Sequence, residues 1–359
     1  MKQSYKTAQT TTHSEHTILV PRTVHGITYM YTLYYKIVRP NFLSSETHAP
    51  LVIVHGGLGL PSDYLQPIAD QIQEERSVVF YDMLGCGRSE SPSSLEYYSI
   101  PDAVHDLYLL IQHLHLTHFH LYAHSAGVVI AYEYLILYNK GWNDYTTTIA
   151  TSSTSTSTTT TNTPTDAEVD TGAATSTGCS SICLSAILAS GSFHLGLAKQ
   201  CTDEAQRKIQ HELEENDESF VINDKEKNLN GDTSDVKRYN LAEQIRKLVI
   251  CRTDTMPLAL KSAYEKSGNV WKGISVIQDY VATCPNDASC IPPILLLRGE
   301  FDFIAEDLVF AGWLNVLGEC ENRIEMTTVR NCSHMLMLED PVSHGQIICD
   351  FYNKHDKSL

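Results

Sequence analysis

Apolar and polar positions along the chain follow two patterns that succeed each other. Short, nearly continuous apolar or aromatic runs predict strands that are buried on both faces. Between them, longer stretches with apolar residues three and four positions apart predict helices. Strands that alternate with helices predict an α/β fold with a mostly parallel central sheet and helices on both faces. The predicted strands cover residues 27–37, 51–54, 78–81, 118–122, 182–188, 294–297 and 323–329, and the helices beside them cover residues 101–116 and 128–135.

Two stretches depart from this alternation. Residues 146–181 are rich in serine and threonine, which predicts a low-complexity surface insertion because such a segment buries too little apolar surface to offset its ordering entropy. Residues 193–289 contain charged, helix-spaced stretches and no clear strand, and we expect them to form a helical lid. The remaining residues, 1–192 and 290–359, form the predicted core, with residues 1–15 loosely ordered. Within the lid we expect helices over 204–218 and 241–263 and a polar loop over 225–237.

The most informative residues follow the predicted strand 118–122. Ser125 lies in the segment Ala123-His124-Ser125-Ala126-Gly127, immediately before a predicted helix. The small residues around the serine allow a sharp turn that lifts its oxygen from the sheet, and the helix directs its amide groups to the same point. This pattern indicates a nucleophile elbow. The usual first glycine is alanine here, which the turn accepts if the φ angle of Ala123 stays negative, while His124 either shapes the pocket or packs in the core.

A serine nucleophile needs a histidine base and an orienting carboxylate, and on this type of scaffold the acid precedes the histidine in the chain. Asp302 follows the predicted strand 294–297, and His334 follows the last predicted strand. We therefore expect Ser125, Asp302 and His334 to form a catalytic triad. Glu300 is the nearby substitute for the acid.

A glycine-rich turn, His55-Gly56-Gly57-Leu58-Gly59, follows the predicted strand 51–54. Such a turn can present a backbone amide to the negative oxygen that develops during acyl transfer. We expect the amides of Gly57 and Ala126 to form this oxyanion hole. The histidines and cysteines show no spacing typical of a metal site, and we expect neither a metal nor another cofactor.

Charge and composition narrow the possible partners. The formal net charge of −17 argues against nucleic acid, because phosphate backbones are bound by basic surfaces. No apolar run reaches the length of a membrane span and the first residues lack a signal-peptide pattern, so we expect no membrane partner. The ten cysteines include no CxxC pair and are expected to be reduced thiols of a cytoplasmic protein. The oligomeric state is left open.

Four motifs together resemble the proline iminopeptidase-like serine peptidases of the α/β-hydrolase superfamily. They are residues 55–59, residues 81–89 (Tyr-Asp-Met-Leu-Gly-Cys-Gly-Arg-Ser), the elbow, and residues 331–335 followed by Leu-Glu-Asp-Pro at 338–341. The resemblance implies an α/β-hydrolase fold that releases an N-terminal residue from short peptides or hydrolyses amino-acid amides. It also implies that two glutamates of the lid, Glu212 and Glu243, hold the free ammonium group of the substrate. A strict preference for proline is not implied, because Leu58 and the pair Met83-Leu84 depart from the family motif.

Two other functions stay open on the same scaffold. A serine esterase or lactonase would use the triad on an ester and would not need a free amine on its substrate. A non-catalytic binding protein is disfavoured because all three triad positions are occupied by the required residue types. The expected partner is therefore a small peptide, an amino-acid amide or an ester. Epoxide hydrolases and dehalogenases are disfavoured because they require a carboxylate where Ser125 stands.

Overall fold

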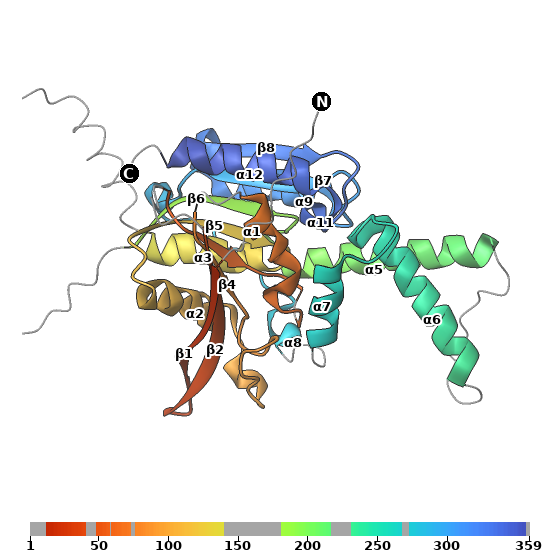
Figure 1. Cartoon of the computed structure of the whole chain (residues 1–359), viewed down its shortest axis with the longest axis horizontal. Coiled ribbons are helices and arrows are strands. Elements are labelled where there is room, and N and C mark those ends of the chain that lie inside the picture. The colour runs from red at the N-terminus through yellow and green to blue at the C-terminus, as the bar shows by residue number, and fades with distance from the viewer. Residues whose placement is uncertain are drawn as a thin grey trace, which may run out of the picture.

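A central sheet of eight strands forms the body of the protein (Figure 1). The computed structural model describes residues 12–40, 48–57, 59–72, 76–139, 181–216, 231–267 and 273–356. The strand order is β1-β2-β4-β3-β5-β6-β7-β8; β3 to β8 run parallel, whereas β1 and β2 form an antiparallel hairpin that joins the sheet through β4. The strands are β1 (Thr12–Val24), β2 (Ile27–Arg39), β3 (Leu51–Val54), β4 (Val78–Tyr81), β5 (His118–His124), β6 (Ile182–Ala189), β7 (Ile294–Gly299) and β8 (Ile324–Val329).

Helices cover both faces of this sheet because successive residues of each strand point to opposite faces. One face packs Val52, Leu121 and Leu296 against α2, α3 and α10, and the other packs Ile53, Tyr122 and Leu297 against α1, α11 and α12. All residues of β3, β4, β6 and β7 are buried, which explains their continuous apolar sequences. The helices of the body are α1 (Pro67–Gln71), α2 (Ile100–His113), α3 (Gly127–Tyr138), α9 (Glu306–Val309), α10 (Ala311–Leu317), α11 (Leu336–Glu339) and α12 (Pro341–His355), with short 3-10 turns at Ser62–Leu65, Leu95–Tyr97, Ala288–Cys290 and Gly318–Arg323.

The strands predicted from apolar runs are confirmed within one or two residues, but the first strand was not predicted. β1 begins at Thr12, inside the stretch that we expected to be loosely ordered up to residue 15, and pairs with β2 over its whole length. Its residues alternate between buried positions such as Ile18 and Val20 and exposed ones such as Leu19. A strand with one solvated face carries many polar residues, so β1 has no continuous apolar run from which it could be predicted. The serine- and threonine-rich stretch lies largely outside the described residues, which resume at 181.

Four helices among the described residues lie between β6 and β7 in the sequence, and the first two of them extend from the body on the right of Figure 1. They are α5 (Leu195–Asn216), α6 (Gly231–Ile245), α7 (Leu258–Lys266) and α8 (Ile274–Ile277), with a π-helical turn at Arg246–Ile250. These helices are the lid of the following sections, and the domain boundaries given above stay a prediction.

Two details of the predicted lid are wrong. Residues 231–237 belong to α6 rather than to a polar loop, and the helix expected over 241–263 is broken between Ile250 and Leu258. Pro257 accounts for the break, because proline has no amide hydrogen and disfavours helical geometry in the residue before it.

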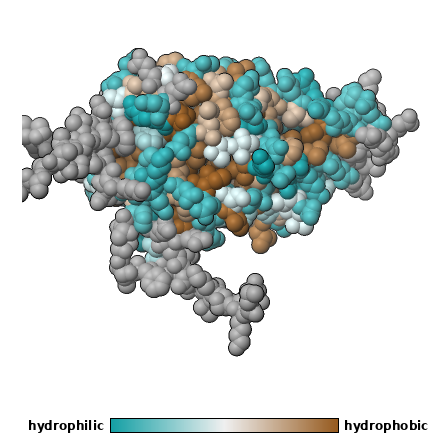
Figure 2. Space-filling model, turned by 90° about the horizontal axis from the view of Figure 1, so that it is seen from above, coloured by the Kyte–Doolittle hydropathy of each residue, from teal (hydrophilic) through white to brown (hydrophobic). Residues whose placement is uncertain are grey.

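The surface combines polar residues with apolar patches. Seen from above, apolar side chains gather in the middle of the face shown in Figure 2 and are bordered by hydrophilic ones. Among the described residues, no helix is both long and apolar enough to cross a membrane.

Candidate active site

The loops that follow β3, β5, β7 and β8 carry the residues predicted for catalysis. Because these strands are parallel, their carboxyl ends lie at one edge of the sheet, which is where ligands bind in open α/β sheets. Gly57 follows β3, Ser125 follows β5, Asp302 follows β7 and His334 follows β8. The topology therefore brings the four predicted loops to the same edge.

Ser125 occupies a sharp turn between β5 and α3. Its φ angle is +55°, a left-handed conformation that a residue other than glycine rarely adopts. The turn is fixed by hydrogen bonds from the Ser125 amide to the Ala189 carbonyl at 2.9 Å and from the Val128 amide to the Ser125 carbonyl at 3.1 Å. Ala123 is an ordinary strand residue paired with Val54 and without a positive φ angle, which explains why alanine serves there.

Two glycines let the backbone of neighbouring loops approach this turn closely. A Cβ atom at Gly127 would lie 2.4 Å from the carbonyl oxygen of His55, and one at Gly56 would lie 2.5 Å from Cβ of Ser125. Any side chain at either position would force the elbow away from the loop after β3. These two glycines therefore hold the predicted nucleophile and the predicted oxyanion loop in van der Waals contact.

Asp302 and His334 form a direct hydrogen bond. The Nδ1 atom of His334 lies 2.9 Å from Oδ1 of Asp302, and both side chains are almost completely buried. The same carboxylate oxygen accepts the Ile304 amide at 3.0 Å, which fixes its orientation. Because a carboxylate only accepts, the shared proton belongs to Nδ1, and Nε2 is left as the basic nitrogen. Glu300 is exposed and accepts the Asn331 amide, so Asp302 is the partner of the histidine.

The loop that carries His334 is held on both sides of the histidine. The carboxylate of Glu339 accepts the Ser333 amide at 2.8 Å, the Ser333 hydroxyl at 2.8 Å and the Met335 amide at 3.1 Å. Burial raises the pKa of this carboxyl group, and the hydrogen bonds from the loop oppose that shift. The ring of Phe303 covers one side of the imidazole, with ring centroids 4.3 Å apart. The sequence analysis assigned no role to Glu339 or Phe303.

The side chain of His55 connects the predicted oxyanion loop to the loop after β4 by two hydrogen bonds. Its Nε2 atom accepts the Met83 amide at 2.8 Å, so the proton lies on Nδ1, which donates to the Gly56 carbonyl at 2.9 Å. Full burial lowers the pKa of His55, which therefore stays neutral. Within the described part of the chain, the amides of Gly57 and Ala126 donate no backbone hydrogen bond, and their role as oxyanion donors stays a prediction.

The glycine-bearing loop at residues 81–89 ties the body to the lid through ion pairs. The Arg88 guanidinium contacts the buried Asp82 at 2.8 Å and Asp63 at 2.6 Å. Asp63 in turn accepts from Ser262 at 3.2 Å and pairs with Lys266, both on α7 of the lid. Burial alone would raise the pKa of Asp82, but the hydrogen bonds and the positive charge of Arg88 lower it below the ordinary value.

Glu243 is engaged within the lid. Its two carboxylate oxygens pair with the buried Arg246 guanidinium at 2.6 and 2.7 Å, and these bonds lower the pKa of Glu243. Arg246 also donates to the carbonyls of Cys251 and Thr253, and thereby closes the π-helical turn. Glu212 is exposed near the carboxyl end of α5, the long helix that leaves the body (Figure 1). The role of both glutamates in binding an amine stays a prediction.

The same π-helical turn contacts the histidine loop directly. The Met335 amide donates to the Ile250 carbonyl at 2.8 Å, and the His334 amide lies 3.4 Å from the Val249 carbonyl. These contacts link the lid to the backbone of the predicted base. No sequence pattern predicts these contacts, since they join main-chain atoms.

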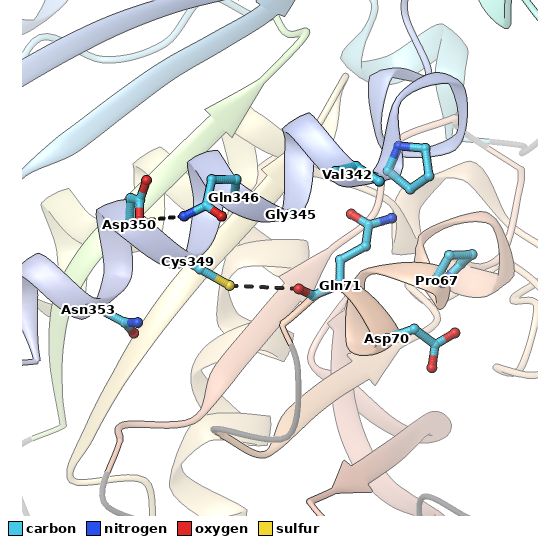
Figure 3. A pocket seen from close by; sticks show the side chains of 10 residues that line it. Pro67, Asp70, Gln71, Val342, Gly345, Gln346, Cys349, Asp350 and Asn353 are labelled. Carbon is cyan, nitrogen blue, oxygen red and sulfur yellow. Dashed lines mark hydrogen bonds between the residues drawn. The ribbon is translucent and has the colours of Figure 1, made fainter. Parts of the chain in front are cut away.

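A surface pocket of about 550 Å³ lies elsewhere, between α1 and α12 (Figure 3). Its walls include Gln71 and Asp70 on one side and Cys349, Asp350 and Asn353 on the other. None of the residues predicted for catalysis lines it. None of the nine cysteines among the described residues forms a disulfide, and the same residues contain no cluster of three or more side chains that could hold a metal ion.

Comparisons with known proteins agree with this fold. A family model described as the alpha/beta hydrolase fold matches residues 49–175. The proline iminopeptidase of Clostridium botulinum is 33% identical over 108 residues, which are 30% of this chain and 36% of that protein. The proline iminopeptidase of Clostridioides difficile is 36% identical over 122 residues, which are 33% of this chain and 40% of that protein. The alignments thus span well under half the length of these relatives.

Solved structures extend the likeness to nearly the whole chain, although at low identity. The crystal structure of a proline iminopeptidase from Mycobacterium smegmatis superposes with a TM-score of 0.63 and 14% identity, over 95% of this chain and 99% of that one. VinJ superposes with a TM-score of 0.62 over 94% and 99% of the two chains. The chain therefore has the α/β-hydrolase fold, and part of its sequence is similar to proline iminopeptidases.

Proposed function

We propose that the protein is a serine hydrolase that cleaves N-terminal peptide or amino-acid amide bonds through an acyl-enzyme on Ser125. The observation that carries the proposal is the buried hydrogen bond between Asp302 and His334, on loops that share a sheet edge with the strained turn at Ser125. A left-handed serine costs free energy that a merely structural turn could avoid, and such strain is concentrated at functional sites.

The proposed reaction proceeds in two steps. Nε2 of His334 takes the hydroxyl proton of Ser125 while Oγ bonds to the carbonyl carbon of the substrate, and the amides of Gly57 and Ala126 stabilise the resulting oxyanion. His334 then gives that proton to the amine nitrogen as the carbon–nitrogen bond breaks and the acyl-enzyme forms. In the second step a water molecule attacks the acyl carbon, His334 takes its proton, and the same proton returns to Oγ as the carboxylic acid leaves.

The surroundings of His334 suit the positive charge that the imidazole carries within each step, after it has taken a proton and before it gives the proton away. Asp302 supplies a directly bonded negative charge, and the Phe303 ring offers its face to the imidazolium. The ring centroids of His124 and His334 lie 4.8 Å apart. Burial and the neighbouring His334 hold the pKa of His124 well below its ordinary value, so His124 adds no second positive charge beside the imidazolium.

Specificity for a free amino terminus is the finer part of the proposal. It is supported by the sequence similarity to proteins named proline iminopeptidase. Glu212 and Glu243 remain the candidate partners of the substrate ammonium, since a buried cation needs a compensating charge. The full pairing of Glu243 with Arg246 weakens that assignment and favours a second candidate function, hydrolysis of an ester that carries no amine.

A substrate panel separates the two candidates. It contains aminoacyl p-nitroanilides and aminoacyl esters, each with a free and an N-acetylated amino group. The peptidase proposal expects cleavage of the free forms and loss of activity on the acetylated ones. Equal cleavage of acetylated substrates would support the esterase instead.

Ser125→Ala tests the mechanism in either case. It should abolish all activity on the panel, and Ser343→Ala, which alters an exposed serine at the start of α12, should not. Activity of Ser125→Ala equal to that of the unaltered protein would refute the serine mechanism. Mass spectrometry of the protein after reaction with a fluorophosphonate locates the nucleophile independently of the choice of substrate.

A further inference from the structure

A chain of buried hydrogen bonds connects the three loops of the proposed active site. The Gly56 amide lies 2.8 Å from the hydroxyl of Tyr64, and that hydroxyl lies 3.0 Å from Nδ1 of His124. At its other end, Nε2 of His124 lies 2.9 Å from the carbonyl oxygen of His334. The chain thus begins in the oxyanion loop, passes the residue before the nucleophile and ends on the backbone of the base.

Only one arrangement of protons satisfies every group in this chain. A carbonyl oxygen can only accept, so Nε2 of His124 carries the proton and Nδ1 is the acceptor. The Tyr64 hydroxyl must then donate to Nδ1, and its free lone pair accepts the Gly56 amide. The chain therefore runs in one direction from Gly56 to His334, with a fixed tautomer of His124.

The chain is closed to solvent, which makes each link costly to lose. Tyr64 and His124 have no exposed surface. A buried donor or acceptor that loses its partner cannot turn to water and incurs its full desolvation cost. A displacement of one loop would therefore break a buried hydrogen bond or displace the next loop as well. The hydrogen bonds thus couple the positions of the three loops.

We propose that Tyr64 and His124 are positioning residues, which set the spacing between the oxyanion loop and the catalytic histidine. This inference rests on the proposed function. Because the Gly56 amide is used by Tyr64, the amide of the next residue, Gly57, is the one presented to the substrate oxyanion. Because the His334 carbonyl is tied to His124, the backbone that carries the Asp302-bonded imidazole of His334 is held in place.

The experiment compares two isosteric variants, Tyr64→Phe and Tyr122→Phe. Tyr122 is an equally buried tyrosine whose hydroxyl lies 2.9 Å from Nε2 of His344. The Nδ1 atom of that histidine faces Oε1 of Gln71, so Tyr122 also donates to a neutral histidine, but this pair does not end on an active-site loop. Each variant removes one buried tyrosine–histidine hydrogen bond, and similar stability losses in urea are expected.

The two variants should differ in kinetics on a substrate that the unaltered protein cleaves. Tyr64→Phe is expected to lower kcat by about tenfold or more, with KM changed less than about twofold, because the oxyanion loop is no longer tied to the loop of the catalytic histidine; tenfold in rate is about 1.4 kcal/mol of activation free energy. Tyr122→Phe should leave kcat within about twofold. Nitrogen-15 NMR of the histidine rings should show His124 protonated on Nε2 in both variants, because the His334 carbonyl still accepts that proton, and a changed Nδ1 chemical shift in Tyr64→Phe only, because Nδ1 loses its donor there.

Equal kcat values for the two variants, or an unchanged Nδ1 chemical shift of His124 in Tyr64→Phe, would overturn the inference. If Tyr64→Phe does not fold, His124→Gln and His124→Leu replace it, because glutamine can both donate and accept whereas leucine can do neither. His124→Gln should then retain the higher kcat, and equal values would again contradict the positioning role. Failure of the proposed function has a different signature: the unaltered protein would not be labelled at Ser125 by a fluorophosphonate.

Discussion

The protein contains a second set of hydrogen-bonded serine, histidine and aspartate side chains: Ser185, His120 and Asp356. Because of this set, we expect the free energy of unfolding to fall steeply in mild acid. His120 contacts the Ser185 hydroxyl through Nδ1 at 2.8 Å and Asp356 through Nε2 at 3.0 Å. The pairing is that of a catalytic triad, but Ser185 and His120 have no exposed surface and lie near the amino ends of their strands. This set is consequently closed to a substrate and joins the end of the chain to the sheet.

The electrostatics of this set give the size and direction of the effect. Burial lowers the pKa of His120 to about 4 from its ordinary 6.5, and the charge of Arg76 adds to this, while its bond to Asp356 opposes it. The folded protein thus binds this proton more weakly than the unfolded chain. Stability from His120 is full above pH 6.5 and is lost as the pH falls towards 4, by about 3 kcal/mol in all and about 2 kcal/mol between pH 7 and pH 4.5.

Asp356 extends the loss to lower pH. Its burial alone would raise its pKa, but hydrogen bonds from His120 and Arg76 bring it to about 2. Its contribution is therefore present above about pH 4 and disappears as the pH falls towards 2. His120 thus lowers stability between about pH 6.5 and pH 4, and Asp356 lowers it between about pH 4 and pH 2. The range of His120 is the easier one to measure.

The measurement is the free energy of unfolding in urea at several pH values between 7.5 and 4.5. His120→Gln replaces the titrating ring by an amide that can donate to Asp356 and accept from Ser185. We expect its stability to fall about 2 kcal/mol less than that of the unaltered protein between pH 7 and pH 4.5. His211→Gln, on the exposed side of α5, is the control and should follow the unaltered protein. Parallel pH profiles for His120→Gln and the unaltered protein would refute the assignment.

Three further variants test the active site and the lid. Asp302→Asn should lower kcat by about three to four orders of magnitude, because the amide favours the wrong tautomer of the base, and initial rates on an arylamide substrate measure this. Gly56→Ala should abolish fluorophosphonate labelling of Ser125, since the added Cβ would lie 2.5 Å from the serine Cβ; labelling at the unaltered rate would contradict that contact. Arg246→Met should destabilise the protein by about 2 kcal/mol in urea unfolding through the loss of its carbonyl and carboxylate partners, whereas Lys247→Met, whose contact is long and exposed, should change stability by less than about 0.5 kcal/mol.

Periodicity and topology explain why most of the fold and the placement of the triad residues could be predicted. Continuous apolar runs mark strands buried on both faces, and parallel strands present their carboxyl ends at one edge. Once the runs at 118–122 and 294–297 are parallel strands of one sheet, Ser125 and Asp302 must lie at the same edge of it. The same reasoning missed β1, because a strand with one solvated face has no continuous run, and it missed the helical character of residues 231–237, which are polar.

The contacts that hold the candidate site together could not be predicted, for a different physical reason. Glu243 and Arg246 are neighbours on one helical face, yet their charges alone do not tell a lid ion pair from a substrate site, since a carboxylate suits either cation. His124 is 210 residues from the carbonyl to which it donates, and Tyr64 is 60 residues from His124. Neither pair shares a strand or helix, so no period of the sequence relates them. The side chains that orient a triad can therefore be assigned only when the fold has fixed which loops meet, and Tyr64→Phe is the variant by which that step from geometry to function is tested.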